Sequence, residues 1–193
     1  ILAPRVIVMK HLKDIDIDNK KVLIRMDYNV PIRGNKIIDS FRIDSTLKTI
    51  QYCLDRDCKI ILMSHLGRPK GVDSNYSLEI IANYIDSIFK NHKVYFSPDC
   101  ISDSAFKISS NLKSKEIHVL ENLRFYKQEK DCDLDFSQHL SRHGEIFVND
   151  AFGTAHRSHA SNVGVARFFG VKSYGFLMAD ELKYLKDNIS DNS

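Results

Sequence analysis

Residues 148–159 read VNDAFGTAHRSH, and within this stretch a short apolar run passes at once into polar, cationic and turn-forming residues. The pattern predicts a buried strand that ends in a ligand-binding loop. The same change of character follows apolar runs at residues 27–31 (DYNVP), 64–69 (SHLGRP) and 121–125 (ENLRF). Because the carboxyl ends of parallel strands lie along one edge of a sheet, where ligands bind, we expect the four segments to form one site.

Along the rest of the chain, short runs rich in Val and Ile alternate with segments whose apolar residues have the spacing of a helix. The predicted strands cover residues 21–26, 59–63, 93–96, 117–120, 146–149 and 173–176, and the predicted helices cover 44–54, 78–89, 102–112, 134–140 and 178–189. This alternation predicts an α/β fold, a three-layer Rossmann-like parallel sheet of about six strands with helices on both faces. The acidic stretch 129–135 is expected to be a solvated connection.

With 193 residues, 43% of them hydrophobic, the chain is long enough for one globular domain. Its net charge of +3 comes from 28 basic and 25 acidic residues without a basic block, which argues against a nucleic-acid partner. No window approaches the roughly 18 apolar residues of a membrane span, and the cysteines form no C-x-x-C pair. We therefore expect a soluble cytoplasmic protein with reduced thiols and no membrane partner.

Arginine is the prominent residue of the four polar segments. Arg68, Arg124 and Arg157, together with Arg42 from the loop before the first predicted helix, outnumber the acids among them. Gly67 permits a tight backbone turn that presents Arg68 to a ligand. Because guanidinium groups bind anions through paired N–H donors, the site is expected to bind a small anion.

Simpler interpretations of the same residues stay open. Arg42 and Arg68 could be solvated surface charges, and Arg124 could form an ion pair with Glu121. Asp27 could begin an Asx turn into the following proline instead of facing a ligand.

Other kinds of site are less well supported by the sequence. His156 and His159 are three residues apart and could share a helix face as metal ligands, but no carboxylate or cysteine joins them at suitable spacing. An anion-binding loop is therefore favoured there over a metal site. Neither G-x-x-x-x-G-K-[ST] nor G-x-G-x-x-G occurs in the chain. The residues themselves indicate an arginine-rich anion site without a phosphate-donor site.

The segments 21–31, 64–69, 121–125 and 149–157 closely resemble phosphoglycerate kinase, in the same order and at comparable separations. The resemblance covers residues 9–189, but only the amino-terminal half of that family's enzyme. It implies a glycolytic enzyme that transfers a phosphoryl group between 1,3-bisphosphoglycerate and ADP, giving 3-phosphoglycerate and ATP with magnesium. The amino-terminal domain of such an enzyme holds the glycerate.

The resemblance also implies roles for individual residues. Asp27 and Asn29 correspond to groups at the hydroxyl and carboxyl end of the substrate, and Arg42 to the catalytic arginine beside the reacting carboxylate. The basic cluster around the 3-phosphate corresponds to His65, Arg68, Arg124 and Arg157, and the adjoining turn residues Leu66 and Gly67 are expected to belong to the substrate-binding set. One departure is Tyr28, which stands where the family usually has Phe.

The same resemblance implies a division of the chain. Residues 9–177 are expected to be the glycerate-binding domain, residues 178–193 the start of an interdomain helix, and residues 1–8 a non-native or upstream extension. Magnesium and ATP or ADP are expected on a carboxyl-terminal nucleotide domain that is absent from the chain, so no cofactor or metal residue is expected here. The chain alone is expected to be an inactive monomer whose partner is that domain. The alternative is a non-catalytic small-anion-binding module on the same fold.

Overall fold

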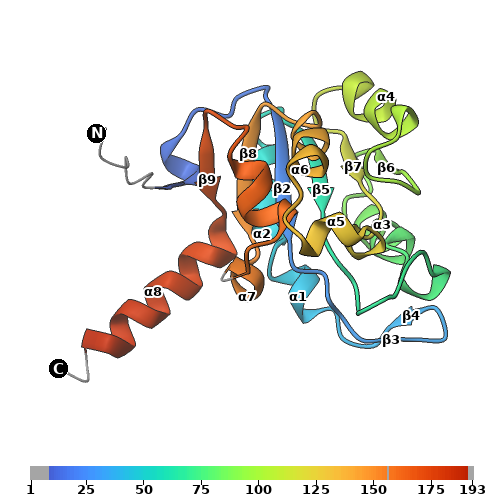
Figure 1. The fold of residues 1–193 in the computed structure, drawn as a ribbon. Helices are drawn as coiled ribbons and strands as arrows, with labels where there is room; N and C mark the ends of the chain where they lie inside the picture. The colour runs from blue at the N-terminus through green and yellow to red at the C-terminus, as the bar shows by residue number, and fades with distance from the viewer. Residues whose placement is uncertain (1–8, 156, 191–193) are drawn as a thin grey trace, which may run out of the picture.

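A computed structural model of the chain describes residues 9–155 and 157–190. Within them a seven-stranded parallel sheet runs in the order β1-β9-β8-β2-β5-β7-β6 (Figure 1). The strands of this sheet are β1 (Lys10–His11), β2 (Lys21–Met26), β5 (Lys59–Met63), β6 (Val94–Phe96), β7 (Ile117–Val119), β8 (Ile146–Asp150) and β9 (Lys172–Tyr174). A separate antiparallel hairpin consists of β3 (Ile32–Arg33) and β4 (Lys36–Ile37).

Helices cover both faces of the sheet. They are α1 (Phe41–Asp44), α2 (Leu47–Leu54), α3 (Glu79–Ile88), α4 (Asp103–Asn111), α5 (Lys127–Lys130), α6 (Leu134–Ser141), α7 (Phe152–Ala155) and α8 (Phe176–Ser190), with 3₁₀ turns at Leu12–Asp14, Ser74–Tyr76 and Leu123–Phe125 and a π-helical turn at Ala160–Gly164. Successive side chains of a strand point to opposite faces. Val22 and Ile24 therefore pack into one core with α2 and α3, while Leu23 packs into a second core with α6. The result is three layers.

The predicted α/β architecture is confirmed. Each of the six predicted strands lies in the parallel sheet, and the predictions for residues 21–26 and 59–63 agree with β2 and β5 to the residue. The additional strand, β1, has two residues and lies at the edge beside β9. Two residues are too few to show an alternation of apolar and polar side chains, so the sequence carried no signal for it.

The predicted helix 44–54 corresponds to α2, which begins three residues later at Leu47, and its first residue, Asp44, instead ends the short helix α1. At the break, Ser45 Oγ donates to the carbonyl oxygen of Phe41 at 2.6 Å, and Thr46 Oγ1 donates to that of Ile43 at 2.7 Å. Hydroxyls that bind the preceding turn in this way compete with regular helix hydrogen bonds. The prediction began too early because apolar spacing does not reveal the two hydroxyl contacts, which separate α1 from α2.

The junction between β9 and α8 comes earlier in the chain than predicted. The Phe176 N–H donates to Thr49 Oγ1 at 3.0 Å, and the Met178 N–H donates to Asp150 Oδ1 at 3.0 Å. These acceptors satisfy N–H groups of the first turn, which have no partner inside a helix. Helix α8 then runs outward from the body beside α7 (Figure 1). The predicted extension at residues 1–8 lies outside the described residues.

The prediction of a solvated connection at residues 129–135 is wrong for its first residue. Glu129 lies on α5 and is fully buried, while Asp133 caps α6 by accepting the Phe136 N–H at 2.8 Å. The side chains that enclose Glu129 come from distant parts of the chain and are described with the site.

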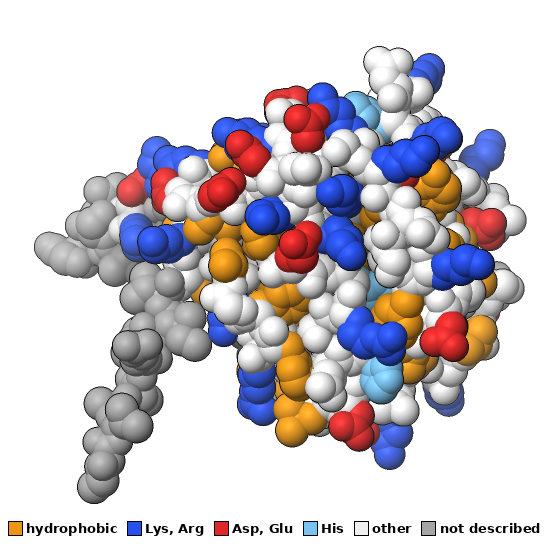
Figure 2. All heavy atoms as spheres, turned by 90° about the horizontal axis from the view of Figure 1, so that it is seen from above, with side chains coloured by type: hydrophobic (Ala, Val, Ile, Leu, Met, Phe, Trp, Pro, Cys, Tyr) orange, Lys and Arg blue, Asp and Glu red, His pale blue; other side chains and the backbone are white. Residues whose placement is uncertain are grey.

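Charges of both signs are interspersed on the face opposite α1 and α7 (Figure 2). Within residues 9–155 and 157–190, no helix combines the length and apolar character needed to cross a membrane.

Candidate functional site

The four polar segments of the sequence meet at one edge of the sheet. Strands β8, β2, β5 and β7 are consecutive neighbours in the sheet, and each is followed by one of these segments. Because all four strands are parallel, their carboxyl ends deliver the segments side by side. The convergence expected from the sequence is therefore confirmed.

Asn122, which follows β7, holds the loop that follows β5. Its Nδ2 donates to the carbonyl oxygen of Leu66 at 2.8 Å, and its Oδ1 accepts the Leu66 N–H at 3.2 Å. The Gly67 N–H donates to Asn29 Oδ1 at 2.8 Å, so the loop is also fixed to the segment after β2. Gly67 has φ +63°, and a Cβ there would lie 2.3 Å from ring atoms of Tyr76. The predicted turn is thus real, with the Leu66 side chain in the core and Arg68 exposed beyond the turn.

Arg124 lies in the 3₁₀ turn after β7, with 8% of its surface exposed. Its Nη1 donates to the Gly67 carbonyl oxygen at 2.8 Å, and its buried Nε has no hydrogen-bond partner among the residues described. The alternative ion pair with Glu121 is not formed, because Glu121 instead accepts from Ser77 Oγ and from the Leu78 N–H, both at 2.8 Å. Arg124 is therefore fixed at this edge of the sheet, and not all of its N–H groups are used in hydrogen bonds within the chain.

Arg25, near the carboxyl end of β2, is a site residue that the sequence analysis missed. It is 1% exposed, its Nε donates to Ser161 Oγ at 2.8 Å, and another N–H binds the carbonyl oxygen of Met26. Its Nη2 lies 3.1 Å from His65 Nδ1. The available signal was a lone arginine two residues after Leu23, which places it on the same face of the strand.

The contact with Arg25 determines which ring nitrogen of His65 carries the proton. A guanidinium only donates hydrogen bonds, so His65 Nδ1 accepts and the ring proton is on Nε2. Burial, helped by the charges of Arg25 and Arg124, lowers the pKa of His65 to about 2. His65 therefore lies in the cluster as a neutral ring with one N–H to donate.

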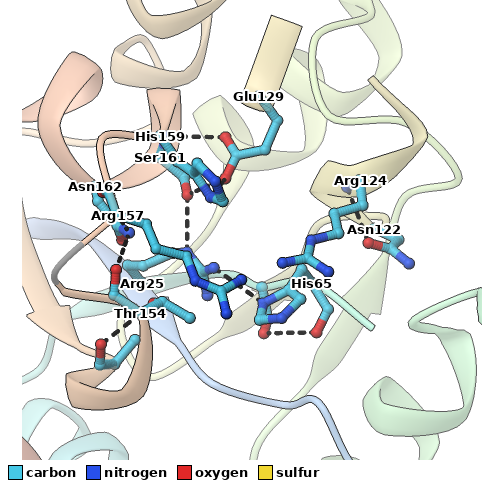
Figure 3. Close-up of polar contacts among 12 residues, drawn as sticks. Arg25, His65, Asn122, Arg124, Glu129, Thr154, Arg157, His159, Ser161 and Asn162 are labelled. Atoms are coloured by element: carbon cyan, nitrogen blue, oxygen red, sulfur yellow. Dashed lines mark hydrogen bonds and ion pairs between the residues drawn. The ribbon is translucent and has the colours of Figure 1, made fainter. Parts of the chain in front are cut away.

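Arg124 and Arg157 reach toward one another from opposite sides of His65 (Figure 3). Burial lowers the pKa of Arg124, and the charges of Arg157 and Arg68 lower it further. The loop that presents Arg157 is shaped by Asn162, whose Nδ2 donates to the carbonyl oxygen of Thr154 at 2.8 Å. Three guanidinium groups that repel one another at the end of a sheet form a site that an anion would stabilise. We refer to Arg68, Arg124 and Arg157 as the arginine cluster.

The possible metal site at His156 and His159 is described for one of its two residues. His156 lies outside the described residues, and His159 Nδ1 faces Glu129 Oε1 at 3.6 Å. Across the described ranges, no group of three or more His, Cys, Asp or Glu side chains is arranged to hold a metal ion.

Arg42 and Asp27 form a second charged pair on the same edge. Arg42 Nη1 donates to Asp27 Oδ2 at 2.5 Å, and the Arg42 side chain remains 54% exposed. Asp27 Oδ1 also accepts the Asn29 N–H at 3.4 Å, which is the Asx turn considered as an alternative. A cavity beside the pair is lined by Gly153 of α7 and by Leu177 of α8. The catalytic arginine expected from the sequence therefore lies between the loop after β8 and the first turn of the outgoing helix.

A family model for phosphoglycerate kinase matches residues 12–193. The chain belongs to the phosphoglycerate kinase family. Two similar relatives are the phosphoglycerate kinases of Aquifex aeolicus, 45% identical over 179 residues, and of Elusimicrobium minutum, 44% identical over 183 residues. These alignments cover 92% and 94% of this chain and 45% of each relative.

Solved structures of phosphoglycerate kinase have the same fold. The enzyme from Coxiella burnetii matches with a TM-score of 0.81 at 29% identity, covering 93% of this chain and 44% of that one. The enzyme from Pyrococcus horikoshii matches with a TM-score of 0.81 at 34% identity, covering 92% of this chain and 45% of that one. The chain thus spans about half the length of the phosphoglycerate kinases that it matches. The resemblance noted in the sequence and the Rossmann-like fold are both confirmed.

Proposed function

We propose that this chain is the glycerate-binding half of a phosphoglycerate kinase. The whole enzyme transfers a phosphoryl group between 1,3-bisphosphoglycerate and ADP and yields 3-phosphoglycerate and ATP in glycolysis. One observation supports this most directly. At the carboxyl ends of the strands, the arginine cluster lies apart from the pair formed by Arg42 and Asp27. Such an arrangement suits a small ligand with a phosphate at one end and a carboxyl group at the other.

In this proposal the arginine cluster binds the 3-phosphate. Planar guanidinium groups bind phosphate bidentately and stay charged at any pH of interest. His65 adds its Nε2–H as a neutral donor. Leu66 and Gly67 form the turn that seats the cluster, because the Gly67 carbonyl oxygen accepts from Arg124.

Asp27, Asn29 and Arg42 hold the opposite end of the glycerate. Asp27 accepts from the substrate hydroxyl while it orients Arg42, and Asn29 fixes the loop that presents Arg68. Arg42 then stabilises the charge that develops on the reacting carboxyl group. In phosphoryl transfer, positioning and charge stabilisation of this kind supply most of the rate.

The nucleotide and its magnesium ion are assigned to a carboxyl-terminal domain beyond this chain. When bound there, the Mg-nucleotide supplies or accepts the phosphoryl group, and its metal ion neutralises charge on the moving phosphate. We further propose that the protein is a cytoplasmic monomer.

Calorimetry with 3-phosphoglycerate tests the proposed binding, with glycerate, which lacks the phosphate, as the matched ligand. We expect 3-phosphoglycerate to bind at least about tenfold more tightly, because charge-assisted hydrogen bonds each contribute about 1.5–3 kcal/mol. Equal affinities would contradict the assignment of the arginine cluster.

A coupled assay for 1,3-bisphosphoglycerate with MgATP then separates an enzyme half from a binding module. The chain alone should show no turnover, and addition of the carboxyl-terminal half of a relative as a separate polypeptide should restore some. Binding without any restored turnover would favour the anion-binding module.

A further inference from the structure

A fully buried carboxylate, Glu129, lies beside the arginine cluster (Figure 3). Burial raises the pKa of this carboxylate, while the charge of Arg25 and the hydrogen bonds from Ser161 oppose that rise and favour the ionised form. Here Glu129 Oε2 accepts the Ser161 N–H at 2.9 Å, and Oε1 accepts from Ser161 Oγ at 2.6 Å. Glu129 is therefore locked to the π-helical turn Ala160–Gly164, which follows the loop that presents Arg157.

Ser161 connects this carboxylate to the site. Its hydroxyl has one hydrogen, which it donates to Glu129, and so it can only accept from Arg25 Nε, at 2.8 Å. Arg25 in turn donates to His65 Nδ1. Arg25 thus donates to His65 on one side and to Ser161 on the other, and Ser161 passes the connection on to Glu129, whose charge offsets that of Arg25. The charges of the arginine cluster remain available to a ligand.

The same carboxylate faces His159, whose side chain is 15% exposed. Nδ1 of His159 lies 3.6 Å from Glu129 Oε1, which is an ion-pair distance when the ring is protonated and too long for a hydrogen bond. Burial lowers the pKa of His159 to about 4, and neighbouring cations lower it further. Five charged groups surround His159. They are Arg25 of β2, Arg124 of the 3₁₀ turn after β7, Arg157 of the loop after α7, and Lys130 and Glu129 of α5.

We propose that Glu129 is a positioning residue for the anion site and that His159, held against it, takes up a proton when a phosphate occupies the arginine cluster. The anion cancels the cationic field that keeps His159 neutral, and Glu129 stays in place to stabilise the imidazolium. The proton comes from the buffer and converts the neutral ring into an imidazolium whose Nδ1–H faces Glu129. The inference rests on the proposed function, since it assumes that the cluster binds the phosphate of the glycerate.

Proton uptake can be measured directly by calorimetry of the 193-residue chain at about pH 6.5 in buffers of different ionisation enthalpy. Two probes are used, 3-phosphoglycerate and inorganic sulfate, because sulfate remains a dianion and releases no proton of its own. We expect uptake with sulfate in the wild-type chain and none in His159→Gln. In Glu129→Gln, which keeps the shape and one of the two acceptor oxygens but loses the charge, uptake should fall at least about twofold.

Glu116→Gln is the matched control, because Glu116 is also buried but binds the Lys113 N–H and the Tyr95 hydroxyl, at the end of β7 away from the site. It should keep the wild-type uptake. Unchanged uptake in either His159→Gln or Glu129→Gln would overturn the inference.

A measurement on the wild-type chain avoids any effect of substitution on folding. The ring carbon shifts of His159, followed by NMR during a pH titration, should give a midpoint near 4 without sulfate and a midpoint at least about two units higher with it. An unmoved midpoint would overturn the inference. Binding of 3-phosphoglycerate without proton uptake would refute only this inference, whereas failure of the wild-type chain to bind it would refute the proposed function as well.

Discussion

Replacing Arg68 by alanine should separate binding from folding more cleanly than any other change in the site. Arg68 is exposed beyond the Gly67 turn, and its charge contributes to the lowered pKa of Arg124. Its removal therefore leaves no cavity in either core and relieves a repulsion between two cations. We expect the free energy of unfolding to change by less than about 0.5 kcal/mol, as for other surface substitutions.

The affinity for 3-phosphoglycerate should fall much further than the stability. A charge-assisted hydrogen bond to phosphate contributes about 1.5–3 kcal/mol, which corresponds to roughly a tenfold to 150-fold rise in Kd for Arg68→Ala. Calorimetric titration measures the affinity, and urea unfolding of the same preparations measures the stability.

Lys70→Ala provides the control for long-range charge. Lys70 is exposed and two residues from Arg68, so its loss changes the net charge by the same amount without removing a proposed contact. If Lys70→Ala weakened binding as much as Arg68→Ala, the effect would be general electrostatic attraction, and the contact assigned to Arg68 would be refuted. An unchanged Kd in Arg68→Ala would refute it too.

Two further changes test the support of the site and the buried histidines. Gly67→Ala should lower the free energy of unfolding, measured in urea, by about 2 kcal/mol, because a left-handed alanine is strained and its Cβ would displace the Tyr76 ring. In the control Gly71→Ala the added Cβ meets open space, so stability should not change. Equal effects of the two substitutions would contradict the role assigned to the Gly67 turn. Burial lowers the pKa of His143 to about 4, below its ordinary value of 6.5. Between these two pH values the folded chain binds fewer protons than the unfolded chain, so its stability should fall as the pH is lowered from 6.5 toward 4. His143→Gln should flatten that fall in unfolding curves recorded across this pH window, and an identical slope would show that another group is responsible.

The features that the sequence predicted well are those set by local chemistry. The run at Lys21–Met26 is apolar enough to identify a buried strand, and Gly67 marks a turn at which only a small residue fits. Arg124 and Arg157 could be assigned to one edge without knowing any contact, because parallel strands bring their carboxyl ends together.

The features that were missed depend on contacts between distant residues. Glu129 stands in an acidic stretch, and its burial follows from Ser161, which lies 32 residues further along the chain. Arg25 looks like an irregularity within an apolar strand until Ser161 and His65 are seen to satisfy its N–H groups. His65 was expected among the basic groups, yet its neutral state depends on burial beside Arg25. A single sequence contains no local pattern for such networks.

Asp150 gives the molecule a mechanical property that the site residues alone do not suggest. It is the last residue of β8, it leads into the loop that presents Arg157, and its Oδ1 accepts the Met178 N–H in the first turn of α8. Helix α8 has 15 residues, and at 1.5 Å per residue it is a rod about 22 Å long. A tilt of only about 5° at this pivot displaces the far end of such a rod by about 2 Å. Any small shift that a bound anion caused at Asp150 would therefore be magnified along α8, far from the ligand that produced it.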